Sequence, residues 1–333
     1  WEQVILAQGC TSREEYFAAS RAGRGVRLDR RQRAEVWKAV EALNRTLIDR
    51  GKRTHLQLAA AAAGYLAQRT VKPYQHIVVD EAQDLHEAQW RMLRAAVAEQ
   101  PDDMFIVGDS HQRIYDRRSS LGKVGIKIVG RSRKLRINYR TTHEILGWSL
   151  SLLGEGRFDD LDDGAETHDF AGYHSYLHGP LPTLHGASST KAQHEALIEL
   201  LTAWRSAGVQ DDEIGITARA GPSLDSAERA LQAAGIPTCL LGQGPPAGPG
   251  VRLGTMHRFK GLEFRCVAVI DVDDDNVPAH WDLTPAAADE VQRANDLQRE
   301  RCLLYVACTR AREDLWIGWS GTPSRFLTGA LDH

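Results

Sequence analysis

Two short apolar runs that lead into acidic residues most constrain what this chain can fold into. Residues 77–79 are β-branched and run directly into Asp80 and Glu81, and residues 104–107 form a second such run. Between them, residues 88–97 have apolar side chains at helical spacing. Strand, polar strand end, helix and strand in this order are typical of an open parallel α/β sheet, whose ligands bind at the carboxyl ends of the strands. The sequence therefore predicts an α/β fold with its acidic groups at the ligand-binding edge.

The rest of the chain divides into a helical segment, a linker and a second α/β unit. Residues 1–72 are predicted to be helical and Arg-rich, with Asp29 as a helix N-cap, and their arginines suit either a solvated face or a phosphate-facing patch. Residues 73–153 form the first α/β unit. Residues 154–190 are Gly-, Asp-, Pro- and His-rich and predict a linker. Residues 191–333 form the second unit.

Individual elements can be placed from the same patterns. Thr141 and Glu144 suggest a capping box at the start of a helix that ends before Gly154. In the second unit, helices are expected at residues 194–204, 223–234 and 286–309, and strands at 214–217, 238–241, 251–253, 266–271 and 314–319.

Composition limits the class of protein but does not indicate its function. The chain has 42% apolar and 26% charged residues, and no apolar run approaches the roughly 18–20 residues that span a bilayer. The lack of such a run predicts a protein that is not bound to a membrane, and five cysteines without a C-x-x-C pair predict a reduced, cytoplasmic one. The net charge of −3 does not indicate a nucleic-acid binder. A loose group of His174, His178 and His185 lacks zinc spacing, so a solvated loop is the better interpretation.

The acidic strand ends have a catalytic and a structural interpretation. Asp80 could hold the water shell of Mg²⁺ while Glu81 polarises an attacking water. Acidic residues are also common at helix N-termini, so this pair alone does not distinguish the catalytic from the structural interpretation. Gln112 follows the neighbouring strand and could sense a terminal phosphate, or lie in a polar turn.

Two further segments carry arginines that suit phosphate. Arg140 has a planar, permanently charged guanidinium that can bind two phosphate oxygens, and Tyr139 beside it offers a flat face for a nucleobase. Arg310 ends the long helix predicted near the C-terminus. Its position alone could be explained by the helix dipole.

Residues 255–264 combine several ligand-binding groups in one short segment. Thr255 and His257 are hydrogen-bonding groups, Gly261 permits close backbone approach, and Glu263 could accept a hydrogen bond from a ribose hydroxyl.

Together these segments resemble motifs II, III, IV, V and VI of the UvrD/Rep family of superfamily 1 helicases. The family forms run like D-E-x-Q-D, G-D-x-x-Q-x-I-Y, N-Y-R-S/T, T-x-H-x-x-K-G-L-E and Y-V-A-x-T-R-A. Their counterparts here are residues 80–84, 108–115, 138–141, 255–263 and 305–311, in the family's order. The resemblance extends over residues 73–319, about three quarters of the chain.

The resemblance implies roles in nucleotide binding and hydrolysis. By similarity, Asp80 holds Mg²⁺, Glu81 activates the attacking water and Gln112 reads the γ-phosphate. Arg140 is expected to reach the γ-phosphate, and Arg310 to act as an arginine finger.

The same resemblance implies how the adenosine and the DNA are bound. Tyr139 is expected to stack on the adenine, with Glu263 and Gly261 at the ribose side of the nucleotide. Thr255 and His257 are expected to contact single-stranded DNA.

The implied architecture is two RecA-like domains of the P-loop NTPase type, the first one incomplete, after an N-terminal helical segment. Residues 1–72 would be the family's 1B subdomain, 73–153 part of 1A and 191–333 the 2A domain. Asp80, Gln112, Arg140, Glu263 and Arg310 are expected to face a cleft between them. The activity implied is an ATP-dependent DNA helicase or translocase with a role in DNA repair. It would move 3′→5′ on single-stranded DNA or at a junction with duplex.

Three departures from the family pattern change these expectations. No G-x-x-x-x-G-K-S/T loop is present, since Gly51-Lys52 and Gly122-Lys123 lack its other residues. We therefore expect that a P-loop segment of the same protein precedes residue 1 and that this chain alone is inactive. Residues 116–120 lack the aromatic that relatives place there, which leaves arginine stacking as a replacement. The interval from Arg140 to Thr255 is too short for the family's large 2B insertion, which favours translocation over processive unwinding.

Two other functions compete with the helicase hypothesis. A degenerate motor could serve as a non-catalytic module that binds DNA or a protein, although Glu81, Arg140 and Arg310 would then have no use. A metal nuclease could use Asp80, Glu81 and Asp84, but it would need a further cluster of carboxylates or lysines near the site, and residues 273–275 are a poor candidate.

Overall fold

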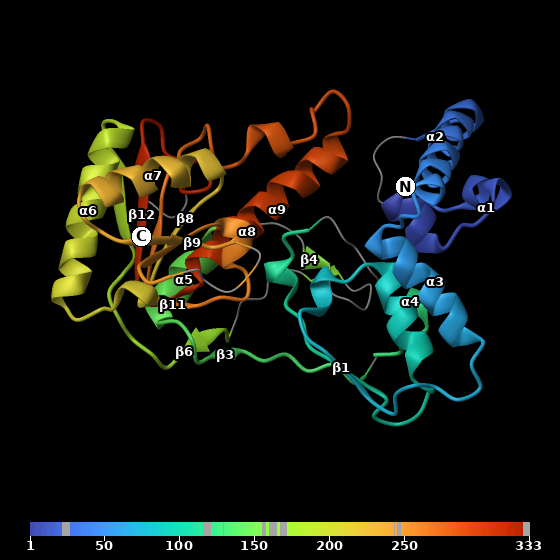
Figure 1. Cartoon of the computed structure of the whole chain (residues 1–333). Helices are drawn as coiled ribbons and strands as arrows, with labels where there is room; N and C mark the ends of the chain where they lie inside the picture. The colour runs from blue at the N-terminus through green and yellow to red at the C-terminus, as the bar shows by residue number, and fades with distance from the viewer. Residues whose placement is uncertain are drawn as a thin grey trace. The chain divides into compact units, whose positions relative to one another are not determined.

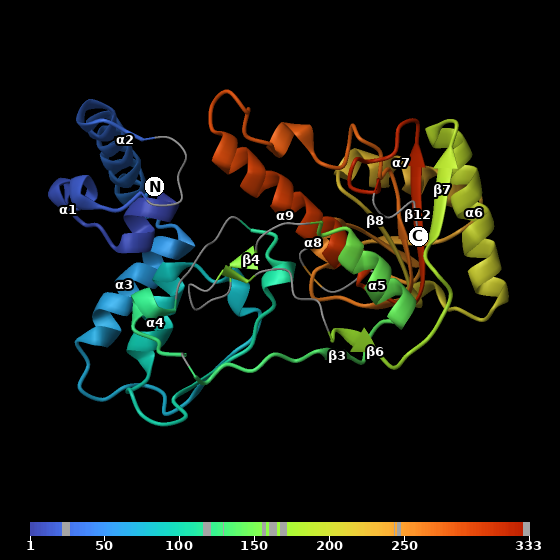
Figure 2. The same ribbon diagram turned by 180° about the vertical axis from the view of Figure 1, so that it is seen from behind.

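The computed structural model describes residues 1–21, 27–115, 121–128, 130–154, 158–159, 165–166, 172–242, 244 and 248–328. The chain separates into two compact units, whose elements are labelled in Figures 1 and 2. Unit 1 comprises Trp1–Arg133, Arg157–Thr167 and Thr284–Ala294. Unit 2 comprises Lys134–Gly156, His168–Leu283 and Asn295–His333.

Unit 1 begins with a helical part that packs around a small apolar core. Asp29 caps α2: its carboxylate accepts a hydrogen bond from the Gln32 amide, and the Gln32 side chain accepts one from the Asp29 amide. This capping box confirms Asp29 as the N-cap. Tyr16 and Trp37 stack in the core beside Val40. The elements are η1 (Glu2–Leu6), α1 (Arg13–Ala18), α2 (Arg30–Asp49) and α3 (His55–Ala67).

The second part of unit 1 is the expected strand–helix–strand arrangement. β1 (Ile77–Val79) and β2 (Met104–Ile106) pair in parallel, and α4 (Glu87–Ala96) connects them. One face of this pair packs on a core that contains Val79, Trp90 and Leu121, because alternate strand residues point to it. Short 3₁₀ turns follow in η2 (Ala82–Asp84), η3 (Ser110–Gln112) and η4 (Gly122–Val124).

Unit 2 is built on a six-stranded parallel sheet in the order β7-β12-β11-β8-β10-β9. Its central strands are buried on both faces, as expected where helices cover a parallel sheet. The strands are β7 (Thr183–Ala187), β8 (Ile214–Ala218), β9 (Thr238–Leu240), β10 (Val251–Thr255), β11 (Phe264–Val269) and β12 (Ala311–Ser320). Together with the strand pair of unit 1, this sheet confirms the α/β class predicted from the sequence.

Helices cover both faces of the six-stranded sheet. α6 (Thr190–Ser206) and α7 (Gly221–Ala233) share one apolar core with β8, β10 and β11. Figures 1 and 2 show α5 (His143–Ser151) and the part of α9 (Glu290–Cys308) that belongs to unit 2 on the side of the sheet away from α6. The remaining elements are β3 (Ile137–Asn138), β4 (Phe158–Asp159), β5 (Ala165–Glu166), β6 (His174–Ser175), η5 (Asp211–Glu213), α8 (Met256–Phe259) and η6 (His280–Asp282).

The segment expected to be a linker contributes to unit 2. β7 lies inside residues 154–190 and pairs with β12 as an edge strand of the six-stranded sheet. Edge strands tolerate glycine and flanking prolines, which is why the composition concealed this strand. Glycine suits position 186, since a Cβ there would lie 3.0 Å from the Trp319 ring and crowd it. Most of the acidic stretch at residues 154–164 lies outside the described residues.

Two local predictions differ from the structure around α5. Its N-cap is Thr142, whose hydroxyl accepts from the Ile145 amide, so the capping box predicted for Thr141 and Glu144 is wrong. Glu144 does not complete the predicted capping box, because its carboxylate accepts hydrogen bonds from His178 Nδ1 and the Gly179 amide. Residues 134–153, with β3 and α5, group with unit 2, whereas the sequence placed them in the first α/β unit. Across the helices that the structure describes, none has the length and apolarity needed to cross a membrane.

Candidate functional site

The acidic pair of unit 1 stands where β1 ends. Asp80 is exposed, and its Oδ1 accepts a hydrogen bond from the Glu81 amide at 2.8 Å. Glu81 has φ of +52°, a left-handed conformation that side chains other than glycine rarely adopt and that costs of the order of 1–3 kcal/mol. Such conformations cluster at functional sites, because the surrounding structure must hold them. The turn therefore presents two carboxylates side by side at the end of a strand.

Gln83 joins this turn to the turn that follows β2. Its Nε2 donates to Glu81 Oε2 at 2.6 Å, and its Oε1 accepts from the Asp109 amide at 3.0 Å. Gly108 makes the approach possible, since a Cβ there would lie 2.9 Å from Gln83 Oε1. Sequence reasoning did not assign Gln83 a role, although the family form D-E-x-Q-D contains this glutamine.

Gln112 lies in the second turn and is held by Asp109. Its Nε2 donates to Asp109 Oδ2 at 2.9 Å, and His111 Nδ1 lies 3.0 Å from Asp109 Oδ1. Burial alone would raise the pKa of Asp109, but the hydrogen bonds and charge of His111 and the amide of Gln112 outweigh it and lower that pKa. Asp109 thus stays ionised and orients Gln112.

Asp80 is suited to hold a hard divalent cation. Mg²⁺ in nucleotide sites is bound by one or two carboxylates together with waters and phosphate oxygens. An exposed carboxylate with one oxygen already oriented fits that role. Within the part of the chain that the structure describes, no group of three His, Cys, Asp or Glu side chains could form an all-protein metal cage.

In unit 2, Arg140 and Glu263 are brought together from distant parts of the sequence. Arg140 Nε lies 2.9 Å from Glu263 Oε2, and Arg312 lies 3.7 Å from the other oxygen. Asn138 Oδ1 accepts from the Arg140 amide at 2.7 Å and so orders the turn. Tyr139 between them is exposed. The residues expected to bind the γ-phosphate, the ribose and the adenine thus come from one surface region of unit 2.

Thr255, His257 and Gly261 follow the carboxyl end of β10. Thr255 is the last residue of that strand, and His257 lies in α8 directly after it. Loss of solvation, then the positive charge of Arg219, lowers the pKa of His257, which favours a neutral imidazole. Gly261 has φ of +80°, which explains the glycine.

Arg310 differs from its expected presentation. It is 2% exposed, and its guanidinium donates to the carbonyls of Val306 and Leu262 and to the Thr309 hydroxyl. These acceptors, two near the end of α9 and one between α8 and β11, satisfy hydrogen-bond donors of the guanidinium inside the protein. An arginine finger must be accessible to the nucleotide. In this structure the Arg310 side chain is buried and is not accessible in that way.

A buried ion network that sequence reasoning missed lies next to His257. Arg219, after β8, donates to both oxygens of Glu300 on α9, with two contacts at 2.9 Å, and also to Asp282. The Ala279 amide donates to Glu300 as well. An arginine two positions after the strand predicted at residues 214–217 was the available signal.

The histidine group considered from the sequence has other partners. His178 pairs with Glu144, and His185 stacks on Trp316 with ring centroids 5.5 Å apart. The segment at residues 116–120, where arginine stacking was considered, lies outside the described residues.

Comparisons with known proteins match both halves of the chain to one helicase family. Residues 26–123 match the UvrD/REP helicase N-terminal domain, and residues 246–322 match the UvrD-like helicase C-terminal domain.

Two curated relatives extend these matches. ATP-dependent DNA helicase UvrD2 of Mycobacterium bovis is 24% identical over 95% of this chain and 60% of that protein. A "Probable DNA helicase" of Mycoplasma pneumoniae is 26% identical over 76% of this chain and 45% of that protein. The chain therefore spans about half of the length of these relatives.

A solved structure described as the C-terminal domain of a possible DNA helicase from Lactobacillus plantarum aligns with 58% of this chain and 94% of its own. It has a TM-score of 0.42 and 20% sequence identity.

The two family domains occur in their expected order, and the five motif segments lie between residues 80 and 311. The chain therefore belongs to the UvrD/Rep-like family of DNA helicases.

Proposed function

We propose that this chain is part of an ATP-dependent DNA motor that translocates 3′→5′ on single-stranded DNA, alone or at a junction with duplex. The observation that carries the proposal is the construction of the β1 and β2 turns. Gln83 joins the carboxylate of Glu81, whose backbone is strained, to the turn that positions Gln112. Such a link couples the group that activates a water to the group that senses a phosphate.

In this proposal each polar group of unit 1 has a separate task. Asp80 holds the Mg²⁺ that neutralises charge on the phosphates. Glu81 orients and polarises the attacking water, and its conformation is fixed by Gln83. Gln112 hydrogen-bonds to the γ-phosphate while Asp109 holds its amide.

In unit 2, the charged side chains would give up their contacts within the protein in order to bind the nucleotide. Arg140 would leave Glu263 for phosphate oxygens, and Glu263 would then be available to a ribose hydroxyl. Tyr139 is exposed and suited to stack on the adenine. Arg310 would have to exchange the Val306 and Leu262 carbonyls for the γ-phosphate, so its engagement requires a local rearrangement.

We further propose that the 333-residue chain does not turn over ATP by itself. A P-loop supplies backbone amides, a lysine on the β- and γ-phosphates and a hydroxyl on Mg²⁺. No G-x-x-x-x-G-K-S/T sequence occurs among these residues. Glu81 and Arg310 would then have no fixed γ-phosphate on which to act.

Binding of a labelled oligo-dT strand, followed by fluorescence anisotropy at increasing salt, tests the DNA-binding part of this proposal. The affinity is expected to fall as salt rises, because phosphate contacts release counterions. Undetectable binding at low ionic strength, or an affinity that does not change with salt, would instead favour a protein-interaction module derived from a helicase.

A further inference from the structure

Trp281 is an exposed aromatic ring to which the motifs assign no role. It is 59% exposed, whereas the other seven tryptophans of the chain are buried or half-buried. A large ring held in water is unfavourable unless it has a partner, and exposed aromatics on binding proteins commonly mark contact sites.

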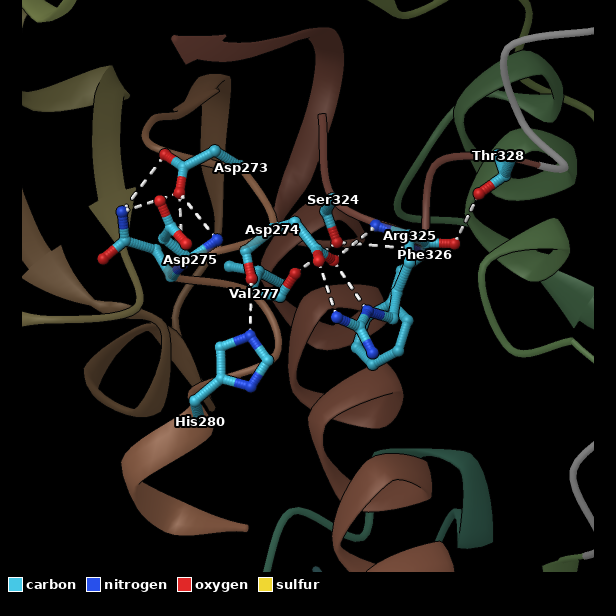
Figure 3. Close-up of polar contacts among 10 residues, drawn as sticks. Asp273, Asp274, Asp275, Val277, His280, Ser324, Arg325, Phe326 and Thr328 are labelled. Atoms are coloured by element: carbon cyan, nitrogen blue, oxygen red, sulfur yellow. Dashed lines mark hydrogen bonds and ion pairs between the residues drawn. The ribbon is translucent and has the colours of Figure 1, made fainter. Parts of the chain in front are cut away.

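The loop that leads to Trp281 is held by its own hydrogen bonds (Figure 3). Asp273 Oδ1 accepts from the amides of Asp275 at 3.2 Å and Asn276 at 3.1 Å. His280, directly before Trp281, donates from Nε2 to the Asp274 carbonyl at 2.8 Å. These contacts fix the backbone on the N-terminal side of the ring.

A second set of contacts fastens the same loop to the segment after β12. The Arg325 guanidinium donates to both carboxylate oxygens of Asp274, at 2.7 and 2.6 Å, and the Ser324 hydroxyl donates to the Val277 carbonyl. Figure 3 shows both contacts beside the His280 ring. A ring carried on a loop with this many fixed points loses little conformational entropy when it binds a ligand.

Arg219 lies on one side of the Trp281 ring. Its guanidinium carbon is 5.9 Å from the ring centroid, and Arg219 itself is 8% exposed and fixed by Glu300 and Asp282. Arg219 thus lies over one face of the ring, while more than half of the Trp281 side chain remains exposed. A cation beside a tryptophan ring also attracts its π-electrons and helps to hold the ring in place.

The ring stands near the groups that we propose contact the DNA strand. Arg219 directly follows β8, whose last residue Ala218 is paired with Thr255 of β10. Arg219 also lies close enough to His257 to influence its pKa. Trp281 is thus at the carboxyl-end side of the six-stranded sheet, where ligands of open α/β sheets bind.

We propose that Trp281 is a stacking platform for a nucleobase of single-stranded DNA, braced by the loop at residues 273–280 and by Arg219. This inference rests on the proposed function and adds a specific contact to it. Every base has a π-face, so such a platform grips the strand without reading its sequence.

The test compares Trp281→Ala, Trp281→Phe and the wild type with two labelled strands of equal length, one of oligo-dT and one of abasic sugar-phosphate. Loss of a stacked base is worth roughly 1–3 kcal/mol, so Trp281→Ala is expected to weaken oligo-dT binding about 5- to 150-fold. Trp281→Phe should keep most of the affinity. Binding of the abasic strand and the salt dependence should not change, since no phosphate contact is lost.

Tyr176→Ala is the matched control, because Tyr176 is 66% exposed in the same unit and is not part of the loop that carries Trp281. It should leave oligo-dT binding at the wild-type level. Three results would overturn this inference and leave the proposed function standing. They are unchanged oligo-dT binding in Trp281→Ala, equal losses of affinity for both strands, and an equal loss of oligo-dT affinity in Tyr176→Ala. Absence of DNA binding by the wild type would refute the proposed function, and this inference with it.

Discussion

Removing the arginine of the buried network in unit 2 should be strongly destabilising. Arg219 is 8% exposed and Glu300 is 3% exposed, and two of their contacts measure 2.9 Å. In Arg219→Met the Glu300 carboxylate would keep the Ala279 amide as a donor but lose its countercharge in a buried position. Breaking such a pair typically costs about 3–5 kcal/mol, because an uncompensated charge remains in the interior.

The assay is native-state hydrogen exchange of the β8 and β11 amides, with urea unfolding as a second measure. Glu300→Gln added to Arg219→Met should recover a large part of the loss, since glutamine can still accept from the Ala279 amide without a buried charge. Lys38→Met is the control: it breaks the exposed Lys38–Glu35 pair and should cost less than about 1 kcal/mol. A loss below about 1 kcal/mol in Arg219→Met, or no recovery in the double variant, would refute the reasoning.

Three further variants probe the motif turns and α5. Gln83→Ala removes both hydrogen bonds between the turns and should destabilise unit 1 by about 1–3 kcal/mol in urea unfolding; an unchanged midpoint would contradict the link. His257→Ala should weaken oligo-dT binding by a larger free energy than it changes stability, and the reverse order would count against a DNA contact. Hydrogen bonds from His178 and the Gly179 amide lower the pKa of Glu144 from 4.5 to about 2. The stabilising effect of Glu144 is therefore complete above pH 4.5 and lost toward pH 2. Glu144→Gln should differ from the wild type in urea unfolding at pH 7 and not near pH 2, whereas a constant difference would refute this assignment.

The parts of the fold that follow from local pattern were predictable. The apolar run at residues 77–79 stops before Asp80, and β1 likewise ends at Val79 in the structure. Asp29 was identified as an N-cap because the capping signal lies within three residues. The strands of the six-stranded sheet, β7 apart, also follow from apolar runs, because strands buried on both faces are continuously apolar.

The parts that depend on partners distant in sequence were not predictable. Thr141 and Thr142 are equally plausible N-caps locally, and the choice depends on Glu144 bonding to His178 and Gly179. β7 is a strand only because β12 pairs with it. The burial of Arg310 likewise depends on the Leu262 carbonyl, 48 positions away in the sequence.

The most direct test of the motor hypothesis is phosphate release from ATP in the presence of single-stranded DNA. It should be measured on the longest protein that the gene encodes, on its Glu81→Gln variant and on the 333-residue chain. Strand-stimulated release is expected from the long protein if it supplies a phosphate loop. Glu81→Gln should abolish turnover while oligo-dT binding persists, and the 333-residue chain should bind the strand without turnover. Robust turnover by the 333-residue chain, or equal turnover by the long protein and its Glu81→Gln variant, would contradict the account.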